Sequence, residues 1–195
     1  MNQLKMTILD NSKNFLIESL SKAIEAESDP NQWKFAILSL IQSIELALKE
    51  RLKTEHPILI FSNIDNKKNT VSLDEALNRL IRIAKVEITH ENIESISIAK
   101  KWRNLIIHYE FDFSIQLVKS VFSRLFSFLL DFYKQQLDEE VKDILPGYLW
   151  DEALEIEEYL IELAKITIEK INVEGYDVMT CYNCGYNTYV LDKDI

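Results

Sequence analysis

The feature that most constrains this chain is its shortage of backbone breakers, because 195 residues contain three glycines and three prolines. The glycines are Gly147, Gly175 and Gly185, so the first 146 residues contain none. A glycine-rich phosphate loop of the P-loop or dinucleotide-binding kind therefore cannot occur in that stretch. Long segments without glycine or proline favour helices over many short strands joined by tight turns. Because 47% of the residues are hydrophobic, the chain can bury a core, and we predict an all-α fold.

Hydrophobic residues recur every three or four positions along most of the chain, a pattern typical of helices with one buried face. Ser72 and Glu75 form a capping-box sequence, and Thr89 is a second candidate N-cap. Breaks are expected at His56-Pro57, over 108–112 and at Pro146-Gly147. The predicted helices cover 12–27, 30 to about 53, the segments behind Ser72 and Thr89, 113 to about 144, and about 148–171.

The composition changes after residue 172, where tyrosine and valine, which favour strands, surround the sequence CYNCG. We therefore predict a helical domain over 1–172 and a short β-hairpin over 173–195. The CxxC turn resembles one knuckle of a zinc ribbon, with Cys181 and Cys184 as two ligands. A closed structural zinc site needs four ligands, so zinc is expected where further ligands complete this half-site. Three interpretations remain open: a piece of a longer protein, ligands from a second chain, or an unligated redox or relic pair.

Charge is distributed unevenly along the chain. The net charge is −10 overall, but it is +3 over 79–124 and −11 over 125–195. An acidic chain disfavours broad non-specific binding to nucleic acids, whereas the basic middle segment leaves room for a focused anion site. The N-terminus lacks the apolar segment of a signal peptide, and no apolar run is long enough to cross a bilayer. We expect a cytoplasmic protein that binds neither membranes nor DNA.

The candidate chemistry lies in residues 101–109, whose sequence is KWRNLIIHY. An arginine offers a planar fork that suits a phosphate, and a histidine exchanges protons near neutral pH. Arg103 and His108 are five residues apart, about 140° around an ideal helix, so a straight helix would separate them. The helix is expected to end near His108, where the ring can turn back toward Arg103. Together the two side chains suit transfer chemistry at a phosphodiester.

A structural interpretation of the same segment competes with this one. His108 can cap the end of the helix by bonding its last carbonyls. Trp102 falls on the apolar face and is expected in the core rather than against a nucleic-acid base. Glu45 lies among apolar positions, so it is either a buried partner for a basic residue such as Arg103 or an exposed glutamate.

The spacing Arg103-Asn104-x-x-x-His108 resembles the Arg-x4-6-His motif of the HEPN superfamily, in which a polar residue often follows the arginine. Residues 43–53, SIELALKERLK, are similar to a HEPN helix that carries a glutamate and a basic end. The loop and capped helix that follow are also similar, and the resemblance covers roughly residues 30–135. One departure concerns HepT-type toxins, which carry a tyrosine two residues after the histidine. Here Tyr109 follows the histidine directly, and Glu110 occupies the next place.

The resemblance implies a helical bundle that forms a homodimer, with the two motifs meeting in a cleft between protomers. Active members are metal-independent endoribonucleases, often toxins or antiviral effectors, so no cofactor is expected for the cleavage. Transferred to this chain, His108 acts as general base or acid, Arg103 stabilises charge on the phosphate, and Asn104 orients either group. Lys101 and Tyr109 are the expected substrate-binding residues. The substrate must be RNA, because the attacking group is the 2′-hydroxyl.

Some HEPN domains are inactive scaffolds, so a non-catalytic dimerisation and interaction module is the alternative function. A third hypothesis is a regulatory subunit that docks through the C-terminal hairpin. In a toxin or phage-defence setting, an antitoxin or regulatory protein is an expected partner. The environment of Arg103 distinguishes the ribonuclease from the interaction module. A ribonuclease places it with Lys101 in a positive cleft, whereas a scaffold buries it in a salt bridge, for example with Glu45.

Overall fold

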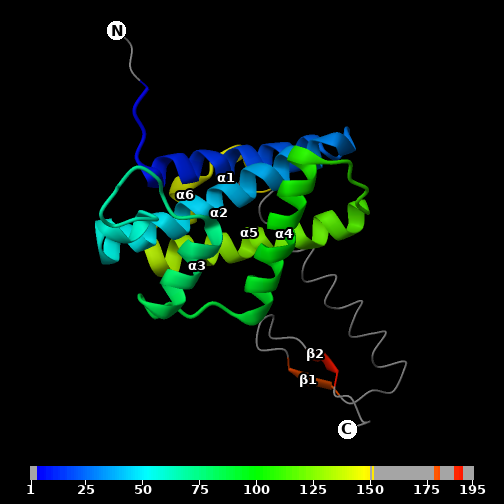
Figure 1. Ribbon diagram of the computed structural model, residues 1–195. Coiled ribbons are helices and arrows are strands. Elements are labelled where there is room, and N and C mark those ends of the chain that lie inside the picture. Colours follow the sequence, from blue (N-terminus) through cyan, green and yellow to red (C-terminus); the bar gives the residue numbers. More distant parts are fainter. Residues whose placement is uncertain (1–3, 150, 152–177, 181–186, 191–195) are drawn as a thin grey trace. The chain divides into compact units, whose positions relative to one another are not determined.

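The computed structural model describes residues 4–149, 151, 178–180 and 187–190 (Figure 1). The chain divides into two units, Met1–Glu152 and Ala153–Ile195. The first unit is built from helices, which confirms the all-α prediction for the bulk of the chain. Its elements are α1 (Ile8–Glu25), the 3₁₀ turn η1 (Pro30–Gln32), α2 (Trp33–Glu55), the 3₁₀ turn η2 (Pro57–Ile60), α3 (Leu73–Arg82), α4 (His90–His108), α5 (Ile115–Leu137) and α6 (Val141–Ile144).

Side chains that precede the helices fix where α3 and α4 begin. The Ser72 hydroxyl accepts the N–H of Glu75 at 3.3 Å, and the Glu75 carboxylate accepts the N–H of Ser72 at 2.8 Å. The Thr89 hydroxyl accepts the N–H of Asn92 at 3.3 Å. Each bond satisfies a backbone donor that has no partner within its helix. The predicted capping box and the predicted Thr89 cap are both confirmed.

Helix α1 begins earlier than the sequence pattern predicted. The predicted start at residue 12 is wrong, because α1 starts at Ile8 behind a capping box formed by Thr7 and Asp10. The Thr7 hydroxyl accepts the N–H of Asp10 at 3.0 Å, and hydrogen bonds from Thr7 lower the pKa of the Asp10 carboxyl. The polar run 10–14 separates Ile8 and Leu9 from the hydrophobic residues that begin at Phe15, so the period that marks a buried face is apparent only after the first turn.

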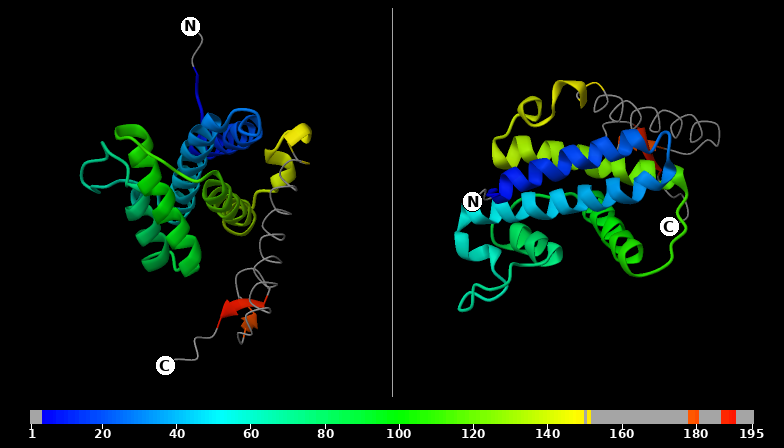
Figure 2. Two further views of the ribbon diagram at one scale, coloured as in Figure 1. Left: turned by 90° about the vertical axis from the view of Figure 1, so that its right-hand side faces the viewer. Right: turned by 90° about the horizontal axis from the view of Figure 1, so that it is seen from above.

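Helix α2 is the centre of the bundle, since it packs against α1, α3, α4 and α5. Figure 1 shows the axes of α1, α2 and α5 roughly aligned, with α1 running opposite to the other two, and α3 and α4 crossing them steeply. Figure 2 shows α3 and α4 together on one side of α2. The buried residues of α2 accordingly spread over several faces, and they include Ala36, Ile37, Leu40, Ile41, Ile44, Ala47, Leu48 and Leu52. Because α4 rests against this central helix, residues of α2 reach the candidate site.

The long helix predicted from 113 to about 144 is interrupted, so that prediction is wrong in its second half. Helix α5 ends at Leu137, and Asp138 takes the left-handed conformation with φ 55° and ψ 40°. The N–H groups of Asp138 and Glu139 both donate to the Tyr133 carbonyl, which closes the helix end. Aspartate adopts this conformation more readily than most residues, but without a glycine the sequence gives little warning of the break.

A buried cluster of three hydroxyl groups joins α1, α2 and α5. Ser12 Oγ donates to the Ser43 carbonyl, and Ser43 Oγ donates to the Ser12 carbonyl, each at 2.7 Å. Each serine proton is therefore used, so the Tyr133 hydroxyl donates to Ser12 Oγ at 2.7 Å. All three side chains are fully buried. The cluster satisfies polar groups that would otherwise be costly in a core.

Alkaline pH is expected to weaken the fold through Tyr133. Burial raises the pKa of Tyr133 from 10.0 to about 12, so the unfolded chain loses this proton at a lower pH than the folded chain. The stabilisation is complete below pH 10 and is lost as the pH rises to 12, by about 3 kcal/mol in total. Denaturant unfolding of the wild type and Tyr133→Phe between pH 8 and 12 measures this. The difference between their unfolding free energies should fall by that amount, and a constant difference would contradict the assignment.

The described part of the second unit contains two short strands. β1 (Val178–Thr180) and β2 (Asn187–Val190) pair antiparallel, with Val178 opposite Val190. Cys181 and Cys184 lie outside the described residues, so the zinc-knuckle turn stays a prediction, as does the domain boundary at 172. The acidic helix predicted over about 148–171 also lies almost entirely outside them. None of the described helices is both long and apolar enough to span a membrane.

Candidate functional site

Helix α4 carries the Arg103–His108 motif and is oriented by one buried face. Ser95, Ile96, Ala99 and Trp102 are its buried residues, and their helical spacing turns this face toward α2 and α5. Trp102 therefore lies in the core, as predicted. Arg103 follows at the border of the buried face, where its side chain remains 28% exposed. The helix thus places the guanidinium beside α2 rather than in open solvent.

A chain of charged contacts links Arg103 to α2. Arg103 Nη1 donates to Glu45 Oε2 at 3.2 Å, and the other carboxylate oxygen of Glu45 accepts from Lys49 Nζ at 2.7 Å. Lys49 Nζ also donates to the Thr70 hydroxyl at 3.1 Å. The Glu45 side chain is 14% exposed and that of Lys49 8%. The interpretation of Glu45 as a buried partner of Arg103 is confirmed, and the exposed alternative is wrong.

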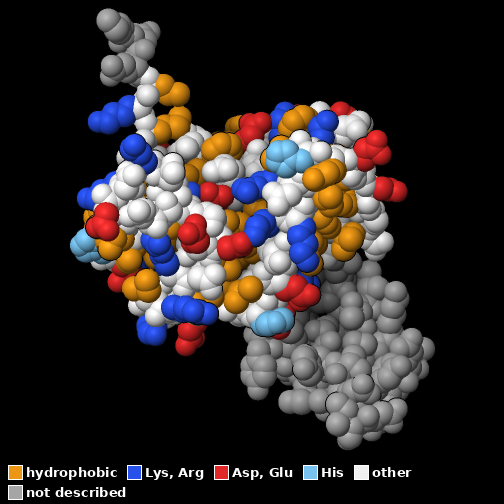
Figure 3. Space-filling model, viewed as in Figure 1, with side chains coloured by type: hydrophobic (Ala, Val, Ile, Leu, Met, Phe, Trp, Pro, Cys, Tyr) orange, Lys and Arg blue, Asp and Glu red, His pale blue; other side chains and the backbone are white. Residues whose placement is uncertain are grey.

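The charges of this cluster do not cancel. One carboxylate stands between two cations, so the group Lys49–Glu45–Arg103 has a net charge of +1. Figure 3 shows basic side chains over α4, interspersed with acidic ones, and a hydrophobic strip beside them toward the α4–α5 connection. Lys100 also pairs with Asp74 of α3 across the helices. The surface around Arg103 is therefore a mixed one, with a local positive excess that suits contact with one phosphate group at a time.

His108 is the last residue of α4, which confirms that the helix ends there. Its side chain is exposed, and Tyr109 leaves the helix with an extended backbone. Within the described part of the chain, the His108 and Arg103 side chains form no hydrogen bond with each other. The physical reason is the angle of about 140° between positions five apart, with Arg103 held against α2 by Glu45.

The other predicted site residues on and beside α4 are exposed. Asn104 and Lys101 lie on the solvent side of α4, and Tyr109 is 74% exposed just beyond the helix. Among the described residues, none of the three forms an ion pair or a side-chain hydrogen bond. One protomer therefore brings Arg103 together with Glu45 and Lys49, and among the described residues no hydrogen bond or ion pair links Arg103 to Asn104 or His108.

Sequence reasoning missed Lys49, the most buried charge of the site. The signal was present, because Lys49 lies one helical turn after Glu45 and between Leu48 and Leu52 on the same buried segment. A lysine among such neighbours requires an acidic partner. Thr70, in the loop before α3, is the second hydrogen-bond partner of Lys49. No sequence pattern indicated that it would contact Lys49.

Metal ligation can be examined for part of the chain. Over residues 4–149 and the two strands, no group of three or more His, Cys, Asp or Glu side chains is placed to hold a metal ion. Cys181 and Cys184, the predicted zinc half-site, lie beyond this part of the structure.

No family model, curated protein or solved structure matches this chain.

Proposed function

We propose that the chain is a metal-independent endoribonuclease of the HEPN type, acting as a toxin or in phage defence, with its active site between two protomers. The observation that carries this proposal is that α4 leaves both motif residues accessible, with the Arg103 side chain 28% exposed and His108 exposed at the helix end. Glu45 holds Arg103 against α2 at 3.2 Å, while His108 stands exposed at the end of α4. In a site built from Arg103 of one protomer and His108 of the second, the arginine and the histidine act on the same phosphodiester.

The proposed reaction is transesterification within the RNA strand. His108 takes the proton from a 2′-hydroxyl, and the 2′-oxygen attacks the adjacent phosphorus while the bond to the 5′-oxygen breaks. A protonated histidine returns a proton to that leaving oxygen. Arg103 stabilises the negative charge that builds on the phosphate, and Asn104 orients the histidine or the phosphate. The products are a 2′,3′-cyclic phosphate and a 5′-hydroxyl, which require no metal and no cofactor.

Exposed apolar side chains next to the motif support a second copy of this chain as the partner. Ile107, Tyr109, Ile115 and Leu117 are each more than 40% exposed, and they surround the connection from α4 to α5. The hydrophobic strip in Figure 3 lies in this region. Apolar side chains that gather on a surface are typical of an interface. Burying this patch between two copies would bring two His108 side chains close to one cleft.

We expect Ile107→Asp to convert the dimer into a monomer. The change places a charge in the apolar patch, where its desolvation opposes association. Light scattering coupled to size exclusion measures the mass directly. The matched control is Ile64→Asp in the loop before α3, because Ile64 is 57% exposed and Ile107 is 55% exposed. A monomeric wild type, or a dimer that survives the change at Ile107, would rule out this interface.

The test of the function is cleavage of an RNA pool in the presence of EDTA. We expect cuts that end in a 2′,3′-cyclic phosphate, and no cleavage of the same sequences made as DNA. Loss of activity with EDTA, or equal cleavage of DNA, would contradict a mechanism based on the 2′-hydroxyl. Identification of the product ends by mass spectrometry separates this reaction from contaminating nucleases that leave other termini.

The alternative function is a catalytically inactive dimerisation and protein-interaction module. The ion pair between Arg103 and Glu45 favours it, because an arginine neutralised by a carboxylate has less charge to offer a phosphate. The two functions differ in one measurable respect. A module would form the dimer and cleave no RNA, whereas the ribonuclease requires both the dimer and the reaction.

A further inference from the structure

Lys49 is a charged member of the site to which the proposed reaction gives no role. Its side chain is 8% exposed, compared with 28% for Arg103. A phosphate at the surface therefore meets the guanidinium of Arg103 before it meets the buried ammonium of Lys49. Burying an ammonium costs free energy, which an ion pair and hydrogen bonds offset. An effect of Lys49 on the reaction must accordingly pass through the groups that it contacts.

The Glu45 carboxylate stands between the two cations. Its Oε1 accepts from Lys49 Nζ at 2.7 Å, and its Oε2 accepts from Arg103 Nη1 at 3.2 Å. The shorter contact goes to the more buried cation. Among the described residues, the Nη1 contact is the one hydrogen bond that the Arg103 guanidinium makes. Since a guanidinium has five N–H donors, Arg103 is oriented by Glu45 and retains donors for a phosphate.

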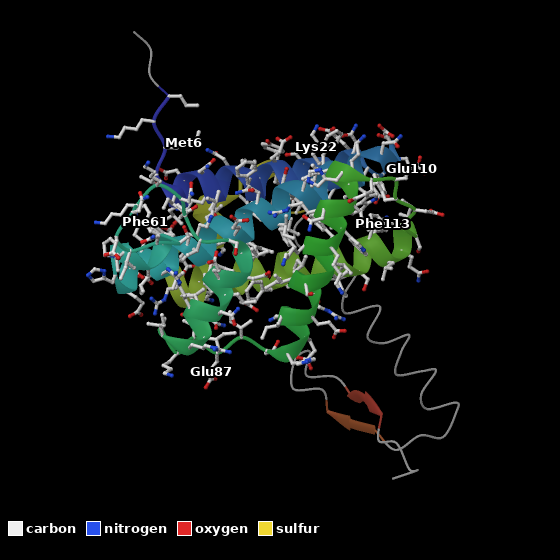
Figure 4. The ribbon with its side chains drawn as sticks, viewed as in Figure 1. Met6, Lys22, Phe61, Glu87, Glu110 and Phe113 are labelled. Carbon is white, nitrogen blue, oxygen red and sulfur yellow. The ribbon has the colours of Figure 1, made fainter. Side chains whose placement is uncertain are left out.

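Lys49 is also held from a second direction. Its Nζ donates to the Thr70 hydroxyl at 3.1 Å. Thr70 is paired with Phe61 by an antiparallel β-bridge, and Figure 4 labels Phe61 in the connection between α2 and α3. Arg79 of α3 donates to the Phe61 carbonyl at 2.8 Å, which anchors this connection. The ammonium is thus fixed between α2 and the connection, and it limits how far its carboxylate partner can turn.

We propose that Lys49 is a positioning residue of the site, which keeps Arg103 available to a phosphate by drawing the Glu45 carboxylate toward itself. The role rests on the proposed ribonuclease function. Without the ammonium, both carboxylate oxygens are free to bind the guanidinium as a fork, the arrangement in which this pair is strongest. Glu45 would then occupy the donors that a phosphate needs. With the ammonium in place, Glu45 orients Arg103 and competes less with the substrate.

Inorganic phosphate is the probe for this role. Phenylglyoxal modifies guanidinium groups, so protection of Arg103 by increasing phosphate reports the affinity of the full chain for the anion. Peptide mass spectrometry distinguishes Arg103 from the other arginines. We expect Lys49→Met to weaken phosphate binding by roughly threefold to tenfold, because the charge that moderates Glu45 is lost. In RNA cleavage the same change should raise KM by a similar factor with kcat unchanged, the pattern of a uniform loss of binding.

Lys53→Met is the matched control for the loss of one positive charge. Lys53 lies one helical turn further along α2, where its side chain is 39% exposed and pairs with Glu50. Its charge is screened by water, so the change should alter phosphate protection by less than about twofold. Urea unfolding verifies that each variant is folded under the assay conditions.

A second background tests whether Lys49 acts through Glu45. Glu45→Gln removes the charge that Lys49 is proposed to moderate. In this background, Lys49→Met should have no further effect on phosphate protection or on KM. An undiminished effect would reduce Lys49 to a charge acting through space and would overturn its positioning role. Equal effects of Lys49→Met and Lys53→Met, or a wild-type Arg103 that tens of millimolar phosphate does not protect, would also overturn it.

The failure of this role can be told apart from the failure of the proposed function. Cleavage of RNA with the same KM in the wild type and Lys49→Met would leave the ribonuclease standing and refute the role of Lys49. Protection of Arg103 that depends on Lys49, in a protein that cleaves no RNA, would refute the ribonuclease and support the control of Arg103 by Lys49.

Discussion

Replacing His108 by alanine is expected to lower the rate of RNA cleavage by roughly 10²- to 10⁴-fold, the usual contribution of a general acid or base. Arg103→Ala is expected to lower it by about 10²- to 10³-fold, because the variant loses a charge that stabilises the phosphate in the transition state. Single-turnover cleavage of a labelled RNA measures both effects. Neither variant should unfold, since His108 is exposed and Arg103 is partly exposed at the edge of the core.

The matched control for His108 is His90, the first residue of the same helix. His90→Ala removes an exposed histidine from the opposite end of α4 and should leave the rate unchanged. A mixture of the Arg103→Ala and His108→Ala proteins tests whether the site is shared. Heterodimers should regain activity, because one protomer supplies the arginine and the other the histidine. Full activity of the His108→Ala protein would refute the assigned role of the histidine.

Glu45→Ala is expected to produce the largest loss of stability among changes at the site, about 3 kcal/mol in the free energy of unfolding. Removing one partner of a buried ion pair leaves the other charge without compensation. Here the uncompensated group is Lys49, whose side chain is 8% exposed. Of its partners among the described residues, it would retain just the Thr70 hydroxyl. Arg103 would also lose its contact with α2. Urea unfolding at pH 7 measures the change.

Glu50 provides the control for Glu45, since it is on the same helix and is 13% exposed, but its partner Lys53 is 39% exposed. Glu50→Ala should cost less than about 1 kcal/mol, as is usual for partly solvated pairs. Combining Glu45→Ala with Lys49→Met should recover much of the loss, because the double variant contains no stranded charge. If Glu45→Ala matched Glu50→Ala in stability, the buried cluster would not be a structural unit.

The same cluster bears on the choice between the two proposed functions. Lys49 shares the Glu45 carboxylate with Arg103, so the arginine is neutralised in part and keeps further N–H donors in its guanidinium group. A phosphate that approached Arg103 would compete with Glu45 for it. Glu45→Gln retains the shape and removes the negative charge. We therefore infer that RNA affinity would rise in this variant if Arg103 binds the phosphate.

Several features of the fold could be predicted from local sequence alone. The caps at Ser72 and Thr89, the burial of Trp102 and the end of α4 at His108 follow from hydrogen-bonding and hydrophobic patterns within one turn or one helix. The early start of α1 and its Thr7 cap were missed because the polar run 10–14 separates Ile8 and Leu9 from the hydrophobic period that follows. The break at Asp138 was missed because a left-handed aspartate leaves no glycine in the sequence.

The sequence by itself determined the helices, since glycine and proline are scarce and the hydrophobic residues keep a helical period. The tertiary structure decided which residues from different helices meet. Lys49, Glu45 and Arg103 form one charged cluster because α4 crosses α2 there, and Ser12, Ser43 and Tyr133 meet where three helices pack. The cavity lined by Trp33, Trp102 and Phe113 likewise depends on the packing of α2, α4 and α5. Such contacts join positions up to 121 residues apart, and local periodicity contains no information about which distant faces will pack.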